Sequence, residues 1–102
     1  DLFSFTVTGS DESRVIRAAK ALRDALGYAV ERREELKPLS IEVLGPAGAS
    51  VVKVNNRYRY RVFLVGKGCP ALRRLVAEYL YAFYQHKENR GLDIFADCNA
   101  IQ

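Results

Sequence analysis

The clearest structural signal in this chain is the sequence SVVKVNNRYRYRVFLV, which spans residues 50–65. Asn55 and Asn56 separate two runs that are rich in β-branched and aromatic residues. Asparagine tolerates the positive φ angles that tight hairpin turns require. The sequence therefore predicts two antiparallel strands, residues 50–54 and 57–65, joined by a two-residue turn.

The residues before this hairpin predict a strand, a helix and the beginning of a second strand. Residues 2–8 alternate between core-type and polar side chains, as a half-buried strand does. Ser10 is the expected N-cap of a helix that Pro38 prevents from continuing. Residues 39–44 predict a strand, which a bend or bulge at residues 45–48 separates from the hairpin. The apolar residues of the helix recur at steps of three and four, at Val15, Ala19, Leu22, Leu26, Ala29 and Val30.

The residues after the hairpin predict a second helix and a last strand. Pro70 suits the first turn of a helix, which we expect to end near residues 89–91. Residues 92–99 alternate again and predict a strand. The order β-α-β-β-α-β, with one apolar stripe on each helix, predicts an α+β protein. The simplest such fold is ferredoxin-like, a four-stranded antiparallel sheet with both helices on one face.

Length and composition indicate one domain over residues 1–102, with 49% hydrophobic residues to build a single core. The sequence contains neither a run of 18 apolar residues nor a signal peptide, so we expect a soluble, cytoplasmic protein that does not contact a membrane. Cys69 and Cys98 are far apart and form no CxxC motif, and we expect both to be reduced and packed. Because methionine is absent, we expect the chain to be a piece of a longer protein.

Charge is distributed unevenly along the chain. Residues 43–77 contain seven Lys or Arg and no Asp or Glu, whereas residues 1–42 sum to −1 and residues 78–102 to −2. The net charge of +4 therefore comes from one segment. A basic segment that also carries aromatic residues is typical of a site for a polyanion, and nucleic acid is the first hypothesis.

The string Arg57-Tyr58-Arg59-Tyr60-Arg61 is the centre of this segment. Because side chains alternate along a strand, the arginines should share one face and the tyrosines the other. Guanidinium groups about 7 Å apart can follow a phosphate backbone, so the arginines are the main predicted DNA contacts. The tyrosines either stack on bases or pack in the core. In the alternative without a ligand, the arginines form a solvated charged face and the tyrosines pack in the core.

Four further basic residues are secondary candidates for an anionic partner. Lys53 lies across the hairpin from the arginines, and Lys67, Arg73 and Arg74 lie at or near the start of the second helix. The backbone N–H groups of a helix start also favour anions.

Catalytic and metal-binding signals are weak. His86 is the only histidine and lies near a helix end without a nucleophile motif around it, so we expect a capping or surface role. Asp93 and Asp97 share one strand face but lack a third ligand, and we expect them to be structural. The sequence therefore predicts neither catalytic nor metal-binding residues in this chain.

Residues 43–65 and the ending Asp97-Cys98-Asn99 resemble the C-terminal domain of the primosomal protein N′ (PriA) family of bacterial replication-restart helicases. The features that carry the resemblance are VLGPA at residues 43–47, the basic hairpin and the RYRYR strand. The chain differs from the family pattern in having Asn56 in place of a glycine and Ala100 in place of a terminal proline.

The resemblance implies a ribosomal-S10-like βαββαβ domain that helps a helicase bind forked or single-stranded DNA. It also implies contact with the rest of the helicase and with the acidic tail of single-stranded-DNA-binding protein. By charge, Arg73 and Arg74 are the candidates for that tail. The ATP, Mg and structural zinc of such a helicase would belong to its other domains, so this piece should bind DNA without unwinding it.

Two other functions stay open at this point. In the first, the domain is a protein-interaction module whose basic strand docks on a helicase core or an acidic peptide. In the second, it is a small ligand-sensing or metal-binding enzyme of ferredoxin-like fold. The small number of acid–base residues argues against this function.

Overall fold

The computed structural model describes residues 1–99, which form four strands and two helices in the predicted sequential order. Two short 3-10 helices, η1 and η2, follow the two long helices. The α+β class is therefore confirmed. The elements are β1 (Leu2–Gly9), α1 (Glu12–Arg32), η1 (Lys37–Leu39), β2 (Glu42–Val54), β3 (Arg57–Val65), α2 (Pro70–Gln85), η2 (Lys87–Asn89) and β4 (Asp93–Cys98).

The four strands of residues 1–99 form one antiparallel sheet in the order β2-β3-β1-β4. The predicted hairpin is confirmed as β2 and β3, which pair from Val54 and Arg57 onward. In its turn, Asn55 has a φ of 52° and Asn56 a φ of 62°. Two successive positive φ angles are typical of a type I′ turn, the turn that best matches the twist of paired strands.

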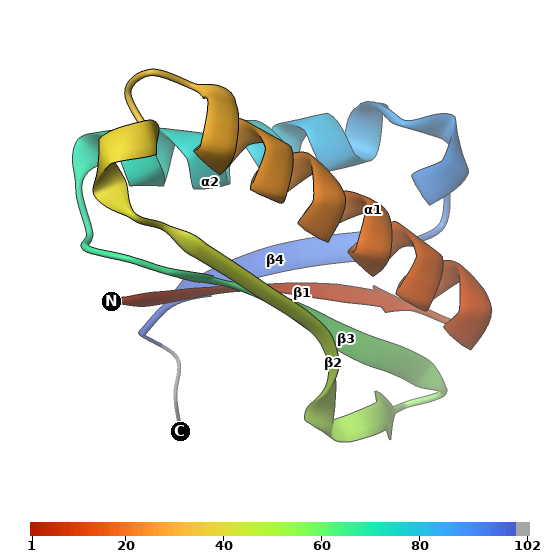
Figure 1. Cartoon of the computed structure of the whole chain (residues 1–102). Helices are drawn as coiled ribbons and strands as arrows, with labels where there is room; N and C mark the ends of the chain where they lie inside the picture. The colour runs from red at the N-terminus through yellow and green to blue at the C-terminus, as the bar shows by residue number, and fades with distance from the viewer. Residues whose placement is uncertain (100–102) are drawn as a thin grey trace.

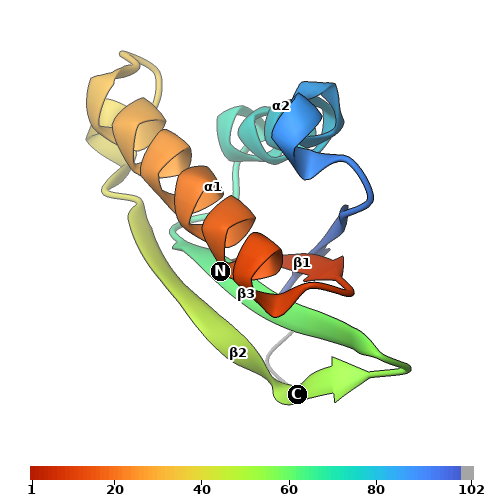
Figure 2. The ribbon, with the colours of Figure 1, turned by 90° about the vertical axis from the view of Figure 1, so that its right-hand side faces the viewer.

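Both helices cover the same face of the sheet, and the opposite face carries neither of them (Figures 1 and 2). The apolar stripes of the helices and one side of the central strands meet between the two layers to form the core. Burial of this kind is the main favourable contribution to folding. The most deeply buried side chains of this core include Phe5, Val7, Val15, Leu26, Leu64 and Leu72.

The sequence predicted a strand that begins at Leu39, but β2 begins at Glu42. Leu36 is only 1% exposed and anchors the chain in the core, and the next residues form the tight turn of η1 instead of a strand. The predicted break in β2 is confirmed, because the register with β3 shifts between Leu44 and Ala47 and again after Gly48. Gly45 has a φ of 102°, and a Cβ there would lie 2.7 Å from a β3 carbonyl oxygen. Glycine is therefore needed at this bend.

The N-cap of α1 is Asp11, and the prediction of Ser10 is wrong by one residue. The Asp11 carboxylate accepts hydrogen bonds from the backbone N–H groups of Ser13, at 3.1 Å, and Arg14, at 3.4 Å. It also accepts a 2.9 Å bond from the Ser13 hydroxyl, which is the largest cause of the lowered pKa of Asp11. A charged cap is favoured here because the unpaired N–H groups carry partial positive charge.

The second half of the chain departs from the prediction at two boundaries. α2 ends at Gln85, earlier than expected, because the chain turns into η2 and the Asn89 side-chain amide donates a 2.8 Å bond to the carbonyl of Phe83. Cys69 packs against the core as expected, but Cys98 is exposed at the end of the edge strand β4. No helix in residues 1–99 is both long enough and apolar enough to cross a membrane.

Candidate nucleic-acid interface

The three arginines of the RYRYR string lie on the sheet face that the helices leave uncovered, as predicted. Val62 and Leu64, which follow the tyrosines on the other side of β3, are fully buried in the core. The register places Arg61 opposite Thr6, and Thr6 opposite Phe95 on the far side of β1. We call this surface the open face. Its positions include Ser4, Thr6, Thr8, Glu42, Leu44, Val54, Arg57, Arg59, Arg61, Phe63, Asp93, Phe95 and Asp97.

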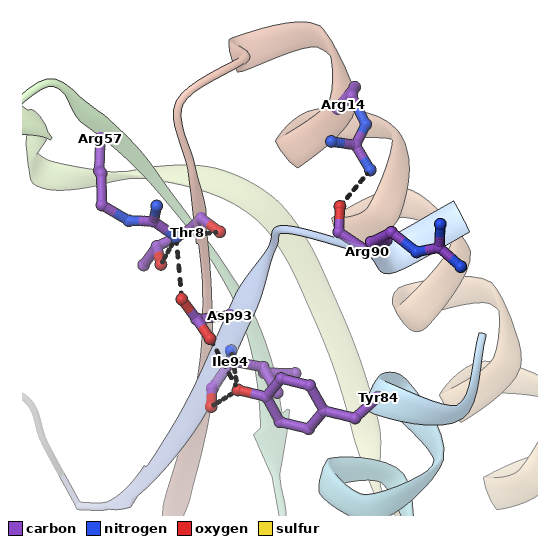
Figure 3. A network of polar contacts seen from close by, with 7 residues as sticks. All are labelled: Thr8, Arg14, Arg57, Tyr84, Arg90, Asp93 and Ile94. Atoms are coloured by element: carbon purple, nitrogen blue, oxygen red, sulfur yellow. Dashed lines mark hydrogen bonds and ion pairs between the residues drawn. The ribbon is translucent and has the colours of Figure 1, made fainter. Parts of the chain in front are cut away.

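Arg57 is already paired with an acid. Its Nη2 lies 3.0 Å from Oδ2 of Asp93 and donates further bonds to the hydroxyl, at 3.2 Å, and the carbonyl, at 3.3 Å, of Thr8 (Figure 3). The absence of acids from residues 43–77 therefore does not leave Arg57 unpaired. Asp93 comes from β4, 36 residues away, which is why the local sequence did not reveal the pair.

Asp93 also helps to join β4 to α2. The Tyr84 hydroxyl accepts a 3.1 Å bond from the backbone N–H of Ile94 and lies 3.3 Å from Oδ1 of Asp93 (Figure 3). These contacts support the structural role expected for Asp93. Within residues 1–99, no group of three His, Cys, Asp or Glu residues is arranged to hold a metal ion.

Arg59 and Arg61 differ from Arg57, because neither forms an ion pair with any residue in 1–99. Arg59 donates one long bond, 3.4 Å, to the carbonyl of Val51, which leaves its positive charge uncompensated. Nε of Arg61 is buried and has no partner among the described residues, and the same holds for the Thr6 hydroxyl opposite it. Arg59 and Arg61 are thus the two arginines of the string without an ion pair in residues 1–99.

The tyrosines lie on the helix side of β3, away from Arg59 and Arg61. Tyr60 donates a 2.6 Å hydrogen bond to Glu12 of α1, which raises the pKa of Tyr60. Tyr58 packs against the core, and Nζ of Lys53 lies 5.2 Å from its ring centroid. The sequence left open whether the tyrosines stack on bases or pack in the core, and both pack against the core. The aromatic side chains on the arginine face are therefore other residues.

The aromatic side chains on the open face are Phe63 and Phe95, which the sequence reasoning did not single out. Phe95 is 45% exposed, a large fraction for an apolar ring on a sheet. Parity was the available signal, because Phe63 is an even number of residues from Arg61 and Phe95 lies between Asp93 and Asp97 on one strand face. The pairing of β1 with both strands then brings these rings onto one surface.

The secondary basic candidates lie apart from Arg59 and Arg61. Lys53 is exposed near the hairpin turn, on the side of Tyr58. Lys67, Arg73 and Arg74 are exposed in the loop after β3 and in the first turns of α2. β3 spans roughly 30 Å, so these three residues lie at the opposite end of the sheet from the turn. The fold therefore divides the basic segment into separate groups.

The open face is not uniformly basic. Besides the Arg57–Asp93 pair, it carries Asp97 on β4 and Glu42, which pairs with Val65 at the far end of β3. Uncompensated positive charge is therefore concentrated on the middle of β3, at Arg59 and Arg61. His86, the only histidine, is the exposed C-cap residue of α2 and lies in the other layer.

Two features of the family resemblance have roles in the backbone. Asn56 adopts a positive φ at the position where a glycine was expected, so its departure from the pattern preserves the turn. Asn99 accepts a 3.0 Å bond from the backbone N–H of Leu2 through its side chain and donates its own N–H to the Leu2 carbonyl. The chain ending thus fixes β4 to β1. Ala100 lies outside the described residues.

Comparison with known proteins agrees with this resemblance. A search of curated proteins found no match to the chain. The family model described as the primosomal protein N C-terminal domain matches residues 1–99, which include every element of the sheet and both helices. The chain therefore belongs to the primosomal protein N C-terminal domain family.

Proposed function

We propose that this domain binds single-stranded or forked DNA on its open face and thereby assists a replication-restart helicase. Membership of a primosomal family supports a role in replication. The single observation that carries the assignment of the site is the pair Arg59 and Arg61. No acid in residues 1–99 pairs with either charge, and both half-buried side chains lie on the strand face that the helices leave uncovered.

The chemistry of this surface fits the nucleic-acid backbone and unstacked bases. Each guanidinium offers forked N–H donors that match phosphate oxygens, and the spacing of Arg59 and Arg61 is about 7 Å along the strand. Phe95 supplies an exposed ring on which a base can stack. Both interactions are independent of base identity. We therefore propose binding that discriminates DNA structure rather than sequence.

The wider assignment rests on the family and is part of the same proposal. The strand order β2-β3-β1-β4, with both helices on one face, supports a ferredoxin-like or ribosomal-S10-like assignment. ATP hydrolysis, with its Mg, and the structural zinc belong in this proposal to the other domains of a cytoplasmic helicase. In this proposal Lys53, on the side of Tyr58, and Lys67, in the loop after β3, add DNA contacts at the two ends of the sheet, away from Arg59 and Arg61. Arg73 and Arg74 meet the acidic tail of single-stranded-DNA-binding protein.

Salt dependence of DNA binding tests the assignment. The affinity of the chain for an oligothymidylate of about 16 nucleotides and for a fork would be measured at several salt concentrations. Replacing Arg59 and Arg61 together with alanine should weaken binding to both ligands and reduce the salt slope by about 0.7 for each lost phosphate contact.

Two single variants sharpen this test. Arg57→Ala should change the slope less than Arg61→Ala, because Arg57 is already paired with Asp93. Arg32→Ala, an exposed site on α1, removes the same charge from the helix layer and should leave the slope unchanged. Equal slopes for the wild-type chain and the Arg59/Arg61 double variant would exclude these residues as phosphate contacts.

A protein partner on the same face is the second candidate, and exposed apolar groups favour it. Leu44 is 47% exposed, and Val54 is 37% exposed beside the hairpin turn. Such groups are typical of interfaces, and in the parent they would dock on the helicase core. Titrating the domain with the remainder of the helicase would support this candidate if Leu44→Ser weakened the complex and left DNA affinity unchanged.

A further inference from the structure

The charge of the open face changes from one strand to the next. β3 carries three arginines there, and β4 carries Asp93 and Asp97. β1 lies between these two strands and contributes only neutral hydroxyls, at Ser4, Thr6 and Thr8. A basic strand and an acidic edge strand therefore lie on either side of a neutral one.

The register places the acidic positions of β4 in line with the arginines. Across β1, Arg59 lies in line with Asp93. One row further along, Arg61 lies in line with Phe95, and Asp97 lies one row beyond Phe95. Neighbouring strands are about 4.8 Å apart, so the backbones of β3 and β4 are about 10 Å apart. The acids therefore flank the Phe95 ring within reach of a ligand that is held on β3.

The two acids of β4 differ in how far their charge is neutralised. Asp93 is paired with Arg57 at 3.0 Å, whereas Asp97 is exposed and forms no ion pair within residues 1–99. Phe95, which lies between the two acids, is 45% exposed. A ligand that reaches the Phe95 ring therefore meets an uncompensated negative charge at Asp97.

We propose that the acidic edge strand β4 restricts the open face to one strand of nucleic acid. This inference rests on the proposed function, in which Arg59 and Arg61 contact phosphates. One backbone then follows β3, and its bases point across β1, where a base can stack on Phe95. An unpaired base is free to turn onto an aromatic ring, whereas a base inside a duplex is held in its own stack.

A duplex held by the same arginines would bring a second backbone toward β4. The grooves of B-form DNA are about 6 Å and 12 Å wide, and the separation of about 10 Å between β3 and β4 lies between these widths. The phosphates of the second backbone would then lie near Asp97. Like charges brought together at an interface oppose binding, and β1 carries no cation on this face to offset the repulsion. Asp97 therefore selects against duplex DNA.

The affinities of the whole 102-residue chain for single-stranded and duplex DNA test this selectivity. The probes are a fluorescent oligothymidylate of about 16 nucleotides and the A·T duplex formed from it, with anisotropy measured at low salt. Asp97→Asn should raise the duplex affinity by about threefold, the effect of two unit charges about 6 Å apart in water, and should change the single-strand affinity less. The gain should fade at high salt, because salt screens exposed charges.

Two further variants show whether the change comes from the charge at this position. Asp97→Glu keeps the charge and should keep the wild-type ratio of duplex to single-strand affinity. Glu31→Gln removes an exposed acid from α1, in the helix layer, and should also leave the ratio unchanged. An amide spectrum of each variant checks the fold.

The outcomes separate this inference from the proposed function. A ratio that Asp97→Asn leaves unchanged, or that Glu31→Gln raises equally, would overturn the inference. An unchanged ratio is also the result expected if the second backbone lay over β2 rather than β4. The proposed function would stand in both cases if the Arg59/Arg61 double variant still reduced the salt slope. Equal salt slopes for that variant and the wild-type chain would overturn the proposed function and this inference together.

Discussion

At the scale of single residues, the central contrast is between Arg57 and its two neighbours on the same strand face. The three arginines are equivalent in the sequence, yet only Arg57 meets a carboxylate, that of Asp93. This pair is largely exposed, and such pairs contribute about 0–1 kcal/mol. The proposed difference in DNA binding therefore rests on charge, because neither Arg59 nor Arg61 is paired with an acid in residues 1–99.

Thr6, which lies opposite Arg61 in the sheet, tests the cost of a buried hydroxyl without a hydrogen-bond partner. Its hydroxyl is buried and has no partner in residues 1–99, so a Thr6→Val substitution removes a desolvation cost. We expect the free energy of unfolding in urea to rise by about 1 kcal/mol. Thr8→Val is the matched control, because the Thr8 hydroxyl accepts a bond from Arg57 and its loss should lower stability. Equal destabilisation by the two variants would contradict this description.

At the scale of elements, the turn between β2 and β3 depends on two asparagines with positive φ. Asn56→Val should lower the free energy of unfolding by about 1–2 kcal/mol, because a β-branched residue is strained in the left-handed region. Asn56→Gly should change it by only a few tenths of a kcal/mol. Chemical denaturation of both variants checks the prediction. Equal stabilities of the valine and glycine variants would show that the turn does not constrain this residue.

The bridge between the two helices makes a pH-dependent contribution to stability. Hydrogen bonds from Arg33 lower the pKa of Glu78 below its ordinary value of 4.5. Because the folded pKa is the lower one, the bridge stabilises the protein above pH 4.5 and loses this contribution as the pH falls through the folded pKa. Its size is about 1 kcal/mol or less, because both side chains are about one-third to one-half exposed.

Comparing the wild-type chain with Glu78→Gln checks this prediction. The difference between their free energies of unfolding should be constant near neutral pH and should shrink toward zero as the pH falls below 4.5. Glu34→Gln, in an exposed pair with Lys37, serves as a control in which little change is expected. A difference for Glu78→Gln that stayed constant down to the lowest pH would contradict the role of the bridge.

Periodicity predicted the elements of this fold better than their ends. The alternation of residues 57–65 and the apolar steps of α1 both reflect packing on one face, which a local pattern records directly. The ends depend on competing local contacts. Asp11 rather than Ser10 caps α1, and the burial of Leu36 delays the start of β2.

The sequence predicted only the part of the candidate site that depends on a local pattern. Strand parity places the arginines on one face, and this needs only the local sequence. The pairing of Arg57 with Asp93 and the arrival of Phe95 on that face depend on β4, which joins the sheet from far along the chain. The contrast in charge between β3 and β4 likewise depends on the pairing of β1 with both strands.

At the scale of the whole molecule, the helix layer and the proposed DNA surface lie on opposite sides of the sheet. The sheet presents Arg59, Arg61 and the phenylalanines on one side, and both helices pack against the other.

A chemical-shift map of the whole chain with a DNA fork would show which face of the sheet contacts DNA. We expect shift changes at the amides of Arg59, Arg61, Phe63 and Phe95, and little change along α1 and α2. Shift changes confined to the helix layer, with β3 and β4 unaffected, would contradict this expectation.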